Sequence, residues 1–346
     1  MANFNSSRYT RLFSQIQTSF TAFNNTSGTW TNTGAQMQRV DQGSLSITRN
    51  APYSRFPVLT GTRSEVAGIR GRKSASWEVR GMPLIPSGVA GTAPDCDSIL
   101  QNIFGAASTG SGQNVYAFSD TGYLPLSLFE FRHGSTTLTS RAVWGAVVTR
   151  VVWNFNGPFL TQDLTGAAGY AIDSTGFADF DSQAQAGLTA FPIEPTSPTV
   201  NGQPIAGFGS GYVATVDTQN LSTKVRVVSI TLETGLTLVG DVYGSPYNVA
   251  VVGDTRRASI ALTALDDDST ALNDIKVKAD TDNTTINATI QAGSVAGSTA
   301  TWLLKNIQLN AFDMKDNGAL VDMEIPTSYA HASSIGATDD MTLTFS

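Results

Sequence analysis

The chain has 346 residues, of which 41% are hydrophobic and only 14% charged, with a net charge of −7 at pH 7. This length suits two domains with buried cores, and the low charge content is typical of a β-rich protein partly covered by neighbours. The single cysteine, Cys96, excludes an internal disulfide and a cysteine-based zinc site, and we expect neither a signal peptide nor a transmembrane span.

Charge is unevenly placed along the chain. Residues 1–170 hold 13 Lys/Arg and 8 Asp/Glu, a net charge of +5, whereas residues 171–346 hold 8 and 20, a net charge of −12. Such asymmetry occurs in nucleic-acid-binding proteins and also in subunits that associate head to tail. The positive residues are scattered arginines and form no basic run, so we favour assembly, with nucleic-acid binding as the alternative.

The N-terminal part, residues 1–62, is expected to form a helix followed by an extended arm. Residues 1–25 have helical apolar spacing, and residues 26–62, which are rich in Thr, Gly and Asn, favour an extended hairpin. The apolar positions on the predicted helix face are Leu12, Phe13, Ile16, Phe20 and Phe23.

The stretch from Gly71 to Phe104 predicts a strand, a loop and a short helix, and a partial echo runs from Gly253 to Ile275. Each copy has a glycine, basic residues and then Ala-Ser at the start of an apolar strand. Asp and Ser then precede a short Leu/Ile-bearing segment, where their oxygens can accept hydrogen bonds from the first turn of a helix.

The echo continues through later strands, which predicts an internal duplication. Ser76 corresponds to Ser259 at an offset of 183 residues, whereas Trp144 corresponds to Trp302 at an offset of 158, and Phe155 to Phe312. The second unit is therefore 25 residues shorter between these points, which fits a tight connection in place of residues 105–122. The alternative is a chance resemblance between two strand–helix–strand runs.

These patterns predict a first module at 63–170, a linker at 171–223 and a second module at 224–346. The linker prediction depends on its prolines and glycines, and Gly207–Gly211 lacks the Gly-Lys-Ser/Thr ending of a phosphate loop. Clear strand patterns in the second module are Val225–Glu233, Ala319–Ile325 and Met341–Phe345.

No pattern of catalytic, cofactor-binding or metal-ligating residues is present, so we expect no enzyme, no cofactor and no metal. His133 and His331 are far apart in the sequence, and Cys96 has no recognisable activating base. Asp266–Asp268 lacks the glycine and glutamate of a calcium loop. Like Asp95 and Asp97 beside Cys96, these acids are interpreted as helix N-terminal residues, favoured there by the helix dipole.

The order of these segments carries a resemblance to a known family. The segments are V-L-T-G-T-R-S-E-V-A-G-I-R-G-R-K-S-A-S-W (58–77), A-P-D-C-D-S-I-L-Q-N-I-F-G, L-P-L-S-L-F-E-F, R-A-V-W-G-A-V-V-T-R-V-V-W-N-F-N-G, V-R-V-V-S-I-T-L-E-T-G, V-V-G-D-T-R-R-A-S-I-A-L-T-A-L-D-D, a late E-I-P and a final D-D-M-T-L-T-F-S. Over about residues 55–346, the chain resembles the tail tube (major tail) proteins of long-tailed bacteriophages, in the form with two modules per chain. Residues 1–54 match the family less clearly, and the segment 170–212 departs from it.

The resemblance implies a mainly β fold with short helices, a β-sandwich or barrel, built as two tandem modules that each have a strand–helix–strand core. It implies a virion protein, assembled in the host cytoplasm, whose rings stack into a hollow tube through which double-stranded DNA passes during ejection. Its partners would be further copies of itself, in a trimeric pseudo-hexamer rather than a hexamer, together with tail terminator and tip or tape-measure proteins, without a membrane.

Three further expectations come from the same reasoning. The channel should be acidic and polar, mainly from residues of the second half, because bound phosphate would stall DNA. The loops 26–62 and 236–252 should reach the next ring, and a non-contractile tail is favoured. The alternatives are another ring-forming virion protein (tail terminator, baseplate or capsid decoration) and a carbohydrate-binding or adhesin sandwich. The latter is disfavoured because Trp30, Trp77, Trp144, Trp153 and Trp302 fall mostly in predicted core strands.

Overall fold

A computed structural model describes most of the chain. The described residues are 10–17, 36–40, 45–50, 53–56, 66–70, 73–120, 123–133, 138–174, 194, 202–207, 212–240, 250–266, 269–281, 284–310, 313–317, 320–326, 329–335 and 337–346. Over these residues the protein is mainly β, with 57% strand, two helices and several antiparallel sheets, which confirms the predicted class. Within the described residues no sheet closes into a barrel.

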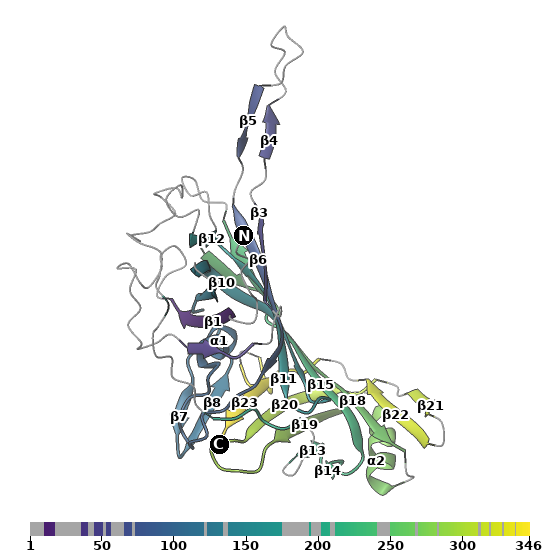
Figure 1. The fold of residues 1–346 in the computed structure, drawn as a ribbon. Helices are drawn as coiled ribbons and strands as arrows, with labels where there is room; N and C mark the ends of the chain where they lie inside the picture. The colour runs from purple at the N-terminus through teal and green to yellow at the C-terminus, as the bar shows by residue number, and fades with distance from the viewer. Residues whose placement is uncertain are drawn as a thin grey trace.

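A long central sheet runs through the molecule (Figure 1). Its strands alternate between buried and exposed residues, as expected for a sheet with one face on the core. In spatial order they are β3 (Leu45–Asn50), β6 (Ser74–Pro83), β11 (Thr161–Ala168), the second half of β10 (Leu138–Asn154), β15 (Val225–Glu233), β18 (Arg257–Leu265), β22 (Leu320–Pro326) and β21 (Asp313–Asn317).

Strand β10 belongs to two sheets. Its first half pairs with β9 and β12, and its second half pairs with β11 and β15, with register irregularities on both sides of the crossing. Bulges of this kind bend a strand and let it pass from one layer to another. The smaller sheet of the first half therefore contains β2 (Gln36–Gln38), β1 (Thr10–Ile16), β9 (Leu126–His133), β10 and β12 (Tyr170–Asp173).

The second smaller sheet draws strands from both halves of the chain. A hairpin of the first half, β7–β8, adds to the edge strand β23 of the second half. Its spatial order is β14 (Gln219–Asn220), β13 (Val213–Val216), β19 (Thr285–Ala292), β20 (Ala300–Gln308), β23 (Met341–Phe345), β8 (Gln113–Ala117) and β7 (Ser108–Gly110).

Two ribbons interrupt the central hairpins. The first, β4 (Tyr53–Phe56) with β5 (Val66–Arg70), stands away from the body of the molecule (Figure 1). Strand β4 lies within the predicted arm of residues 26–62, whereas β5 lies in the predicted first module. The second is β16 (Leu236–Val239) with β17 (Ala250–Gly253). Each ribbon connects two strands of the central sheet.

Two short helices follow corresponding strands, as predicted. Helix α1 (Asp97–Phe104) follows β6 and buries most of its residues, and α2 (Thr270–Ala279) follows β18. The hydroxyl of Ser269 accepts a hydrogen bond from the N–H of Leu272, a typical N-cap. The predicted strand–helix–strand order is therefore present in both halves.

One continuous core joins the halves. Trp153 and Trp302 are fully buried with ring centroids 6.0 Å apart, and Phe155 packs edge-on against Trp302 at 5.1 Å. Aromatic pairs at such distances stabilise a core beyond their buried area by about 0.5–1.5 kcal/mol. Trp77 and Trp144 are also buried, which confirms the prediction for these four tryptophans, and Trp30 lies outside the described residues.

The predicted N-terminal helix is wrong over the described residues, where the chain forms strand β1. This strand pairs with β9 over seven residues. Leu12 faces the main core and Phe13 the separate cluster on the other face of the sheet, so adjacent apolar residues reflect a strand buried on both sides. The spacing of Leu12, Phe13 and Ile16 is the same as that of one face of a helix, which led to the wrong prediction. Phe20 and Phe23 lie outside the described residues.

The strand-pairing order of the first half recurs in the second. In each half, the chain forms a strand of the central sheet, a two-stranded ribbon, a second strand of the central sheet and then a helix. The strands after the helix lead from the smaller sheet of that half into the central sheet. Before the helices, β1, β2, β3, the ribbon β4–β5 and β6 correspond to β13, β14, β15, the ribbon β16–β17 and β18, and α1 corresponds to α2. After the helices, β9, β11 and β12 correspond to β19, β22 and β23. The long strand β10 corresponds to two strands, its first half to β20 and its second half to β21.

The pairing registers confirm one predicted correspondence and correct another. Ser76 lies opposite Thr48 and Ser259 opposite Thr231, so the offset of 183 is right for these strands. Trp144 and Trp302 do not correspond, because Trp144 lies in the separate cluster and Trp302 in the main core. The registers match Val143 with Leu304 instead, at an offset of 161. Phe155 accordingly does not correspond to Phe312.

The segment predicted as a linker, 171–223, is partly structured. It contains the end of β12 and the short strands β13 and β14. Residues 202–207 pack on the first half, where the N–H of Ile205 donates to Leu84 O and the N–H of Leu160 donates to Ile205 O. The prolines of this segment are therefore compatible with short strands and single hydrogen bonds in its described part.

Candidate assembly surfaces

Cys96 and its acidic neighbours have structural roles. Asp97 accepts hydrogen bonds from the hydroxyl of Tyr116 at 2.6 Å and from the amide of Gln101 at 2.7 Å. Asp95 lies 3.5 Å from a guanidinium nitrogen of Arg39. Cys96 is buried, and burial raises the pKa of its thiol to about 12, so the reactive thiolate is disfavoured.

Cys96 is therefore expected to resist thiol reagents in the folded chain. With Ellman's reagent at pH 8, we expect no release of chromophore from native protein and one equivalent after guanidinium unfolding. Rapid stoichiometric labelling without denaturant would contradict the buried, protonated thiol.

The remaining candidate residues do not converge on one site. Asp266 forms an ion pair with Lys276, with 3.1 Å between the ammonium nitrogen and a carboxylate oxygen. Asp267, Asp268 and the side chain of His133 lie outside the described parts of the structure. Among the described residues, no group of three or more His, Cys, Asp or Glu side chains could hold a metal ion. No helix within the described ranges is long and apolar enough to cross a membrane.

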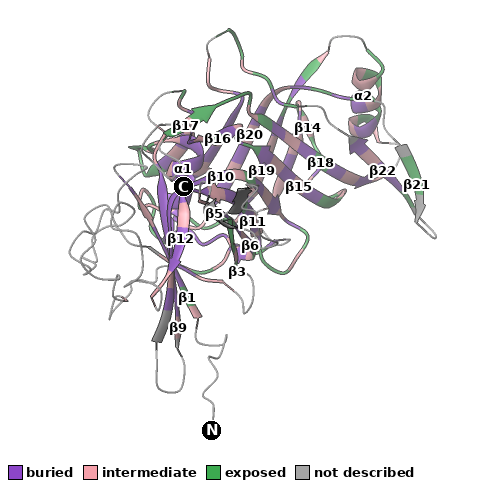
Figure 2. Cartoon of the chain, turned by 90° about the horizontal axis from the view of Figure 1, so that it is seen from above, coloured by how far each residue is buried: buried purple, intermediate pink, exposed green. Residues whose placement is uncertain are grey.

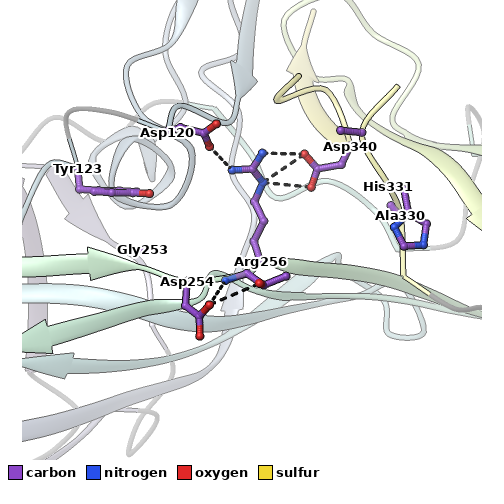
Figure 3. A pocket seen from close by; sticks show the side chains of 10 residues that line it. Asp120, Tyr123, Gly253, Asp254, Arg256, Ala330, His331 and Asp340 are labelled. Atoms are coloured by element: carbon purple, nitrogen blue, oxygen red, sulfur yellow. Dashed lines mark hydrogen bonds and ion pairs between the residues drawn. The ribbon is translucent and has the colours of Figure 1, made fainter. Parts of the chain in front are cut away.

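A polar pocket of about 470 Å³ lies where the two halves meet (Figure 3). Arg256, just before β18, is at its centre. Its guanidinium donates to both carboxylate oxygens of Asp340 at 3.1–3.2 Å and to Asp120 of the first half at 2.7 Å. The guanidinium also lies 4.4 Å from the ring centroid of Phe118. This geometry connects the two halves of the chain.

The charge of Arg256 is held by these two carboxylates. Burial of the guanidinium opposes its charge, but the hydrogen bonds to Asp340 and Asp120 outweigh this effect and raise the pKa of Arg256. A partly buried cation with two acidic partners is more firmly held than an exposed surface pair. Because Asp120 comes from the first half and Asp340 from the second, the interaction fixes the halves to each other.

Backbone pairing forms the main connection between the halves. Residues 150–154 of β10 pair with residues 229–233 of β15 in antiparallel register. Just beyond this pairing, the N–H of Thr234 donates to Thr149 O at 3.0 Å and its hydroxyl donates to Val148 O at 2.6 Å. We call this contact between β10 and β15 the internal seam.

The strands of the internal seam have counterparts at the two ends of the central sheet. The second half of β10 corresponds to β21, and β15 corresponds to β3. Ser46-Ile47-Thr48 of β3 and Ser229-Ile230-Thr231 of β15 are identical and stand at the same offset of 183 as Ser76 and Ser259. This identity was not part of the predicted echo, and it extends the echo to both strands that enclose each ribbon.

These counterpart strands form open edges. Among the described residues, β3 pairs only with β6, and β21 pairs only with β22. The two strands lie at opposite ends of the sheet (Figures 1 and 2). Met314 on β21 is 53% exposed, which is unusual for a large apolar side chain on a strand. Unpaired edges with exposed apolar residues are ready to pair with another chain.

The outer face of the central sheet is polar and balanced in charge. Neighbouring strands place Glu78, Thr165, Arg150, Glu233 and Arg257 in a single row across it. The described charged side chains that lie on this face, or form ion pairs with residues on it, are equally divided between the two signs. Five are positive (Arg80, Arg150, Arg226, Arg257 and Lys315) and five are negative (Glu78, Asp163, Glu233, Asp322 and Glu324).

Comparison with known proteins gives no assignment, because no family model and no curated protein matches the chain. The open edges, the internal seam and the polar outer face are therefore the observations that any proposal for the function must explain.

Proposed function

We propose that this chain is the subunit of a hollow tube like those formed by the tail tube proteins of long-tailed bacteriophages. In this proposal the two halves are duplicated tube modules, and the protein is a structural component of the virion tail with no enzymatic activity. The observation that carries the proposal is the recurrence of the internal seam as two open edges at opposite ends of the same sheet.

The internal seam is a template for the contact between chains. The registers match Val152, Trp153 and Asn154 of β10 with Asp313, Met314 and Lys315 of β21. In the seam, the three β10 residues pair with Thr231, Ile230 and Ser229. The same pairing between copies would place Met314 of one copy opposite Ile47 of the next, with Asp313 opposite Thr48 and Lys315 opposite Ser46.

Such a contact is heterologous, since it joins different surfaces of two identical chains. It closes into a ring when the rotation between chains allows, and three chains would then supply six modules. Ring closure would remove both open edges, which explains why the chain retains them. The positive first half and negative second half suit the same head-to-tail order.

Stacking of rings requires a second contact, for which the β4–β5 ribbon is the stronger candidate because it projects from the body (Figure 1). The other predicted loop, 236–252, is anchored on its own chain at its base. A side chain at Gly253 would lie 2.2 Å from the hydroxyl of Tyr123, so the ribbon packs closely against the first half.

The outer face of the central sheet is the surface that would line the channel. Its charge is balanced, which differs from the acidic lining expected from the sequence. A balanced polar surface also avoids strong binding of DNA, because few uncompensated cations are available to displace the counterions of the phosphates. Tail terminator and tip or tape-measure proteins would bind the ends of the tube during assembly in the host cytoplasm, without a membrane.

A disulfide across the predicted joint tests this proposal. The variant with Ile47→Cys and Met314→Cys should form covalent oligomers on oxidation, with tubes or rings visible by negative-stain electron microscopy. Cys96 gives no background because it is buried. The matched control pairs Ile47→Cys with Val295→Cys, which is 65% exposed but lies off the sheet edge.

The possible outcomes separate the alternatives. Cross-linked, stacked tubes with a threefold repeat of chains would support the full proposal, whereas six chains per ring would refute the two-module count. Closed rings that never stack would favour a tail terminator, baseplate or decoration protein. Equal cross-linking in the test and control variants would refute the predicted joint.

A further inference from the structure

Lys73 in the first half of the chain occupies the position that corresponds to Arg256 in the second half. Each residue directly precedes the corresponding strand, β6 or β18, at the offset of 183 that relates those strands. Each also contacts the start of the last strand of its own half. The ammonium of Lys73 lies 5.4 Å from the ring centroid of Tyr170 at the start of β12, and Arg256 binds Asp340 immediately before β23.

Arg256 has a second partner, Asp120, which comes from the preceding half of the chain. Asp120 stands six residues before Leu126, the first residue of β9. The pairing of β9 with β10 has the same register as the pairing of β19 with β20, so Leu128 corresponds to Ala288 and Leu126 to Ile286. The side chains of Leu126 and Ile286 both lie in the main core. Six residues before Ile286 stands Asp280.

Asp280 is placed to meet a cation. It is exposed, and it is the residue that ends α2, where its backbone N–H caps the last turn. The partial negative charge of a helix C-terminus adds to the attraction of the carboxylate for a cation. The last-turn lysines of α2 are already held within their own chain, Lys276 by Asp266 and Lys278 by Asp217.

We infer that Lys73 of one copy forms an ion pair with Asp280 of the preceding copy, in the place where Arg256 meets Asp120 within one chain. The inference rests on the proposed head-to-tail joint and adds a specific charged contact to it. The intrachain version has an arginine with two carboxylates, whereas the interchain version has one lysine and one carboxylate. The joint between chains is therefore the more salt-sensitive of the two.

Zero-length cross-linking with a carbodiimide tests this contact directly. The chain has six lysines, so the cross-linked peptides are few and readily assigned by mass spectrometry. We expect a Lys73–Asp280 link in assembled wild-type protein and none in monomer. Assemblies that form the disulfide between positions 47 and 314 but never this link would overturn the ion pair while leaving the proposed function intact. A chain that never assembles would overturn both.

Charge reversal provides the second test. Lys73→Glu and Asp280→Lys should each lower the yield of assembled protein at least severalfold, Lys73→Arg should retain it, and the double reversal should restore most of it. Arg256→Glu, at the corresponding position, should lower the thermal midpoint of the monomer, because both carboxylate partners of Arg256 belong to the same chain. Normal assembly of Lys73→Glu, or no rescue by the double reversal, would overturn the inference.

Discussion

Replacing Met314 by aspartate is expected to abolish assembly while leaving the monomer folded. In the proposed joint, Met314 takes the position that Trp153 holds in the internal seam, where the side chain is fully buried. An unpaired carboxylate at such a position costs on the order of 2–5 kcal/mol per joint. Because 1.4 kcal/mol is about a factor of ten in affinity, each joint weakens by about 30-fold or more.

Sedimentation velocity and electron microscopy would measure the loss of assembly, and circular dichroism would verify that the monomer is folded. Val295→Asp is a suitable control, since Val295 is 65% exposed and lies in the turn between β19 and β20, outside β3 and β21. Met314→Leu should assemble normally, because it keeps an apolar side chain in the joint. Tubes formed by Met314→Asp at wild-type yield would exclude β21 as the interface strand.

Replacing Gly166 by valine should strongly destabilise the fold itself. Gly166 on β11 lies directly opposite Trp77 on β6, and the indole covers the glycine. A Cβ atom at Gly166 would lie 2.2–2.4 Å from three atoms of this ring, and Trp77 is only 2% exposed with no room to move. Overpacking of this kind costs about 1–3 kcal/mol or more, so we expect a clearly lower thermal midpoint.

Gly110→Ala is the matched control for this prediction, since a Cβ there meets no atom within 4 Å. A double-mutant cycle with Trp77→Leu should show that the smaller side chain relieves part of the damage caused by Gly166→Val. Unchanged stability of Gly166→Val would mean that the β6–β11 pair tolerates separation, contrary to the packing described here.

Much of the local structure could be predicted from short-range patterns. Val225–Glu233 alternates in polarity and forms β15 with those bounds, and Met341–Phe345 forms β23. The strand–helix order after Ser76 and Ser259 was predictable because alternating strand patterns act over a few neighbours, but the expected side-chain cap forms only at Ser269 of α2 and not at the start of α1. The identity of Ser46–Thr48 with Ser229–Thr231 was also available in the sequence.

Other features depend on contacts between residues that are distant in the sequence. β1 imitates a helix because Leu12 and Phe13 enter separate apolar clusters, which a pattern on one segment cannot distinguish from a helical face. The similarity of Trp144 to Trp302 was misleading for the same reason, since only the pairing registers show which face each side chain occupies.

By itself, the sequence determined that the chain is mainly β and that strand–helix units occur twice. These follow from side-chain periodicity and turn chemistry, which are local. Only the tertiary structure decided that β10 and β15 join the halves edge to edge, and that the corresponding edges β21 and β3 remain open among the described residues. Edge pairing is made by backbone groups common to nearly all residues, so side-chain patterns do not specify which strands meet.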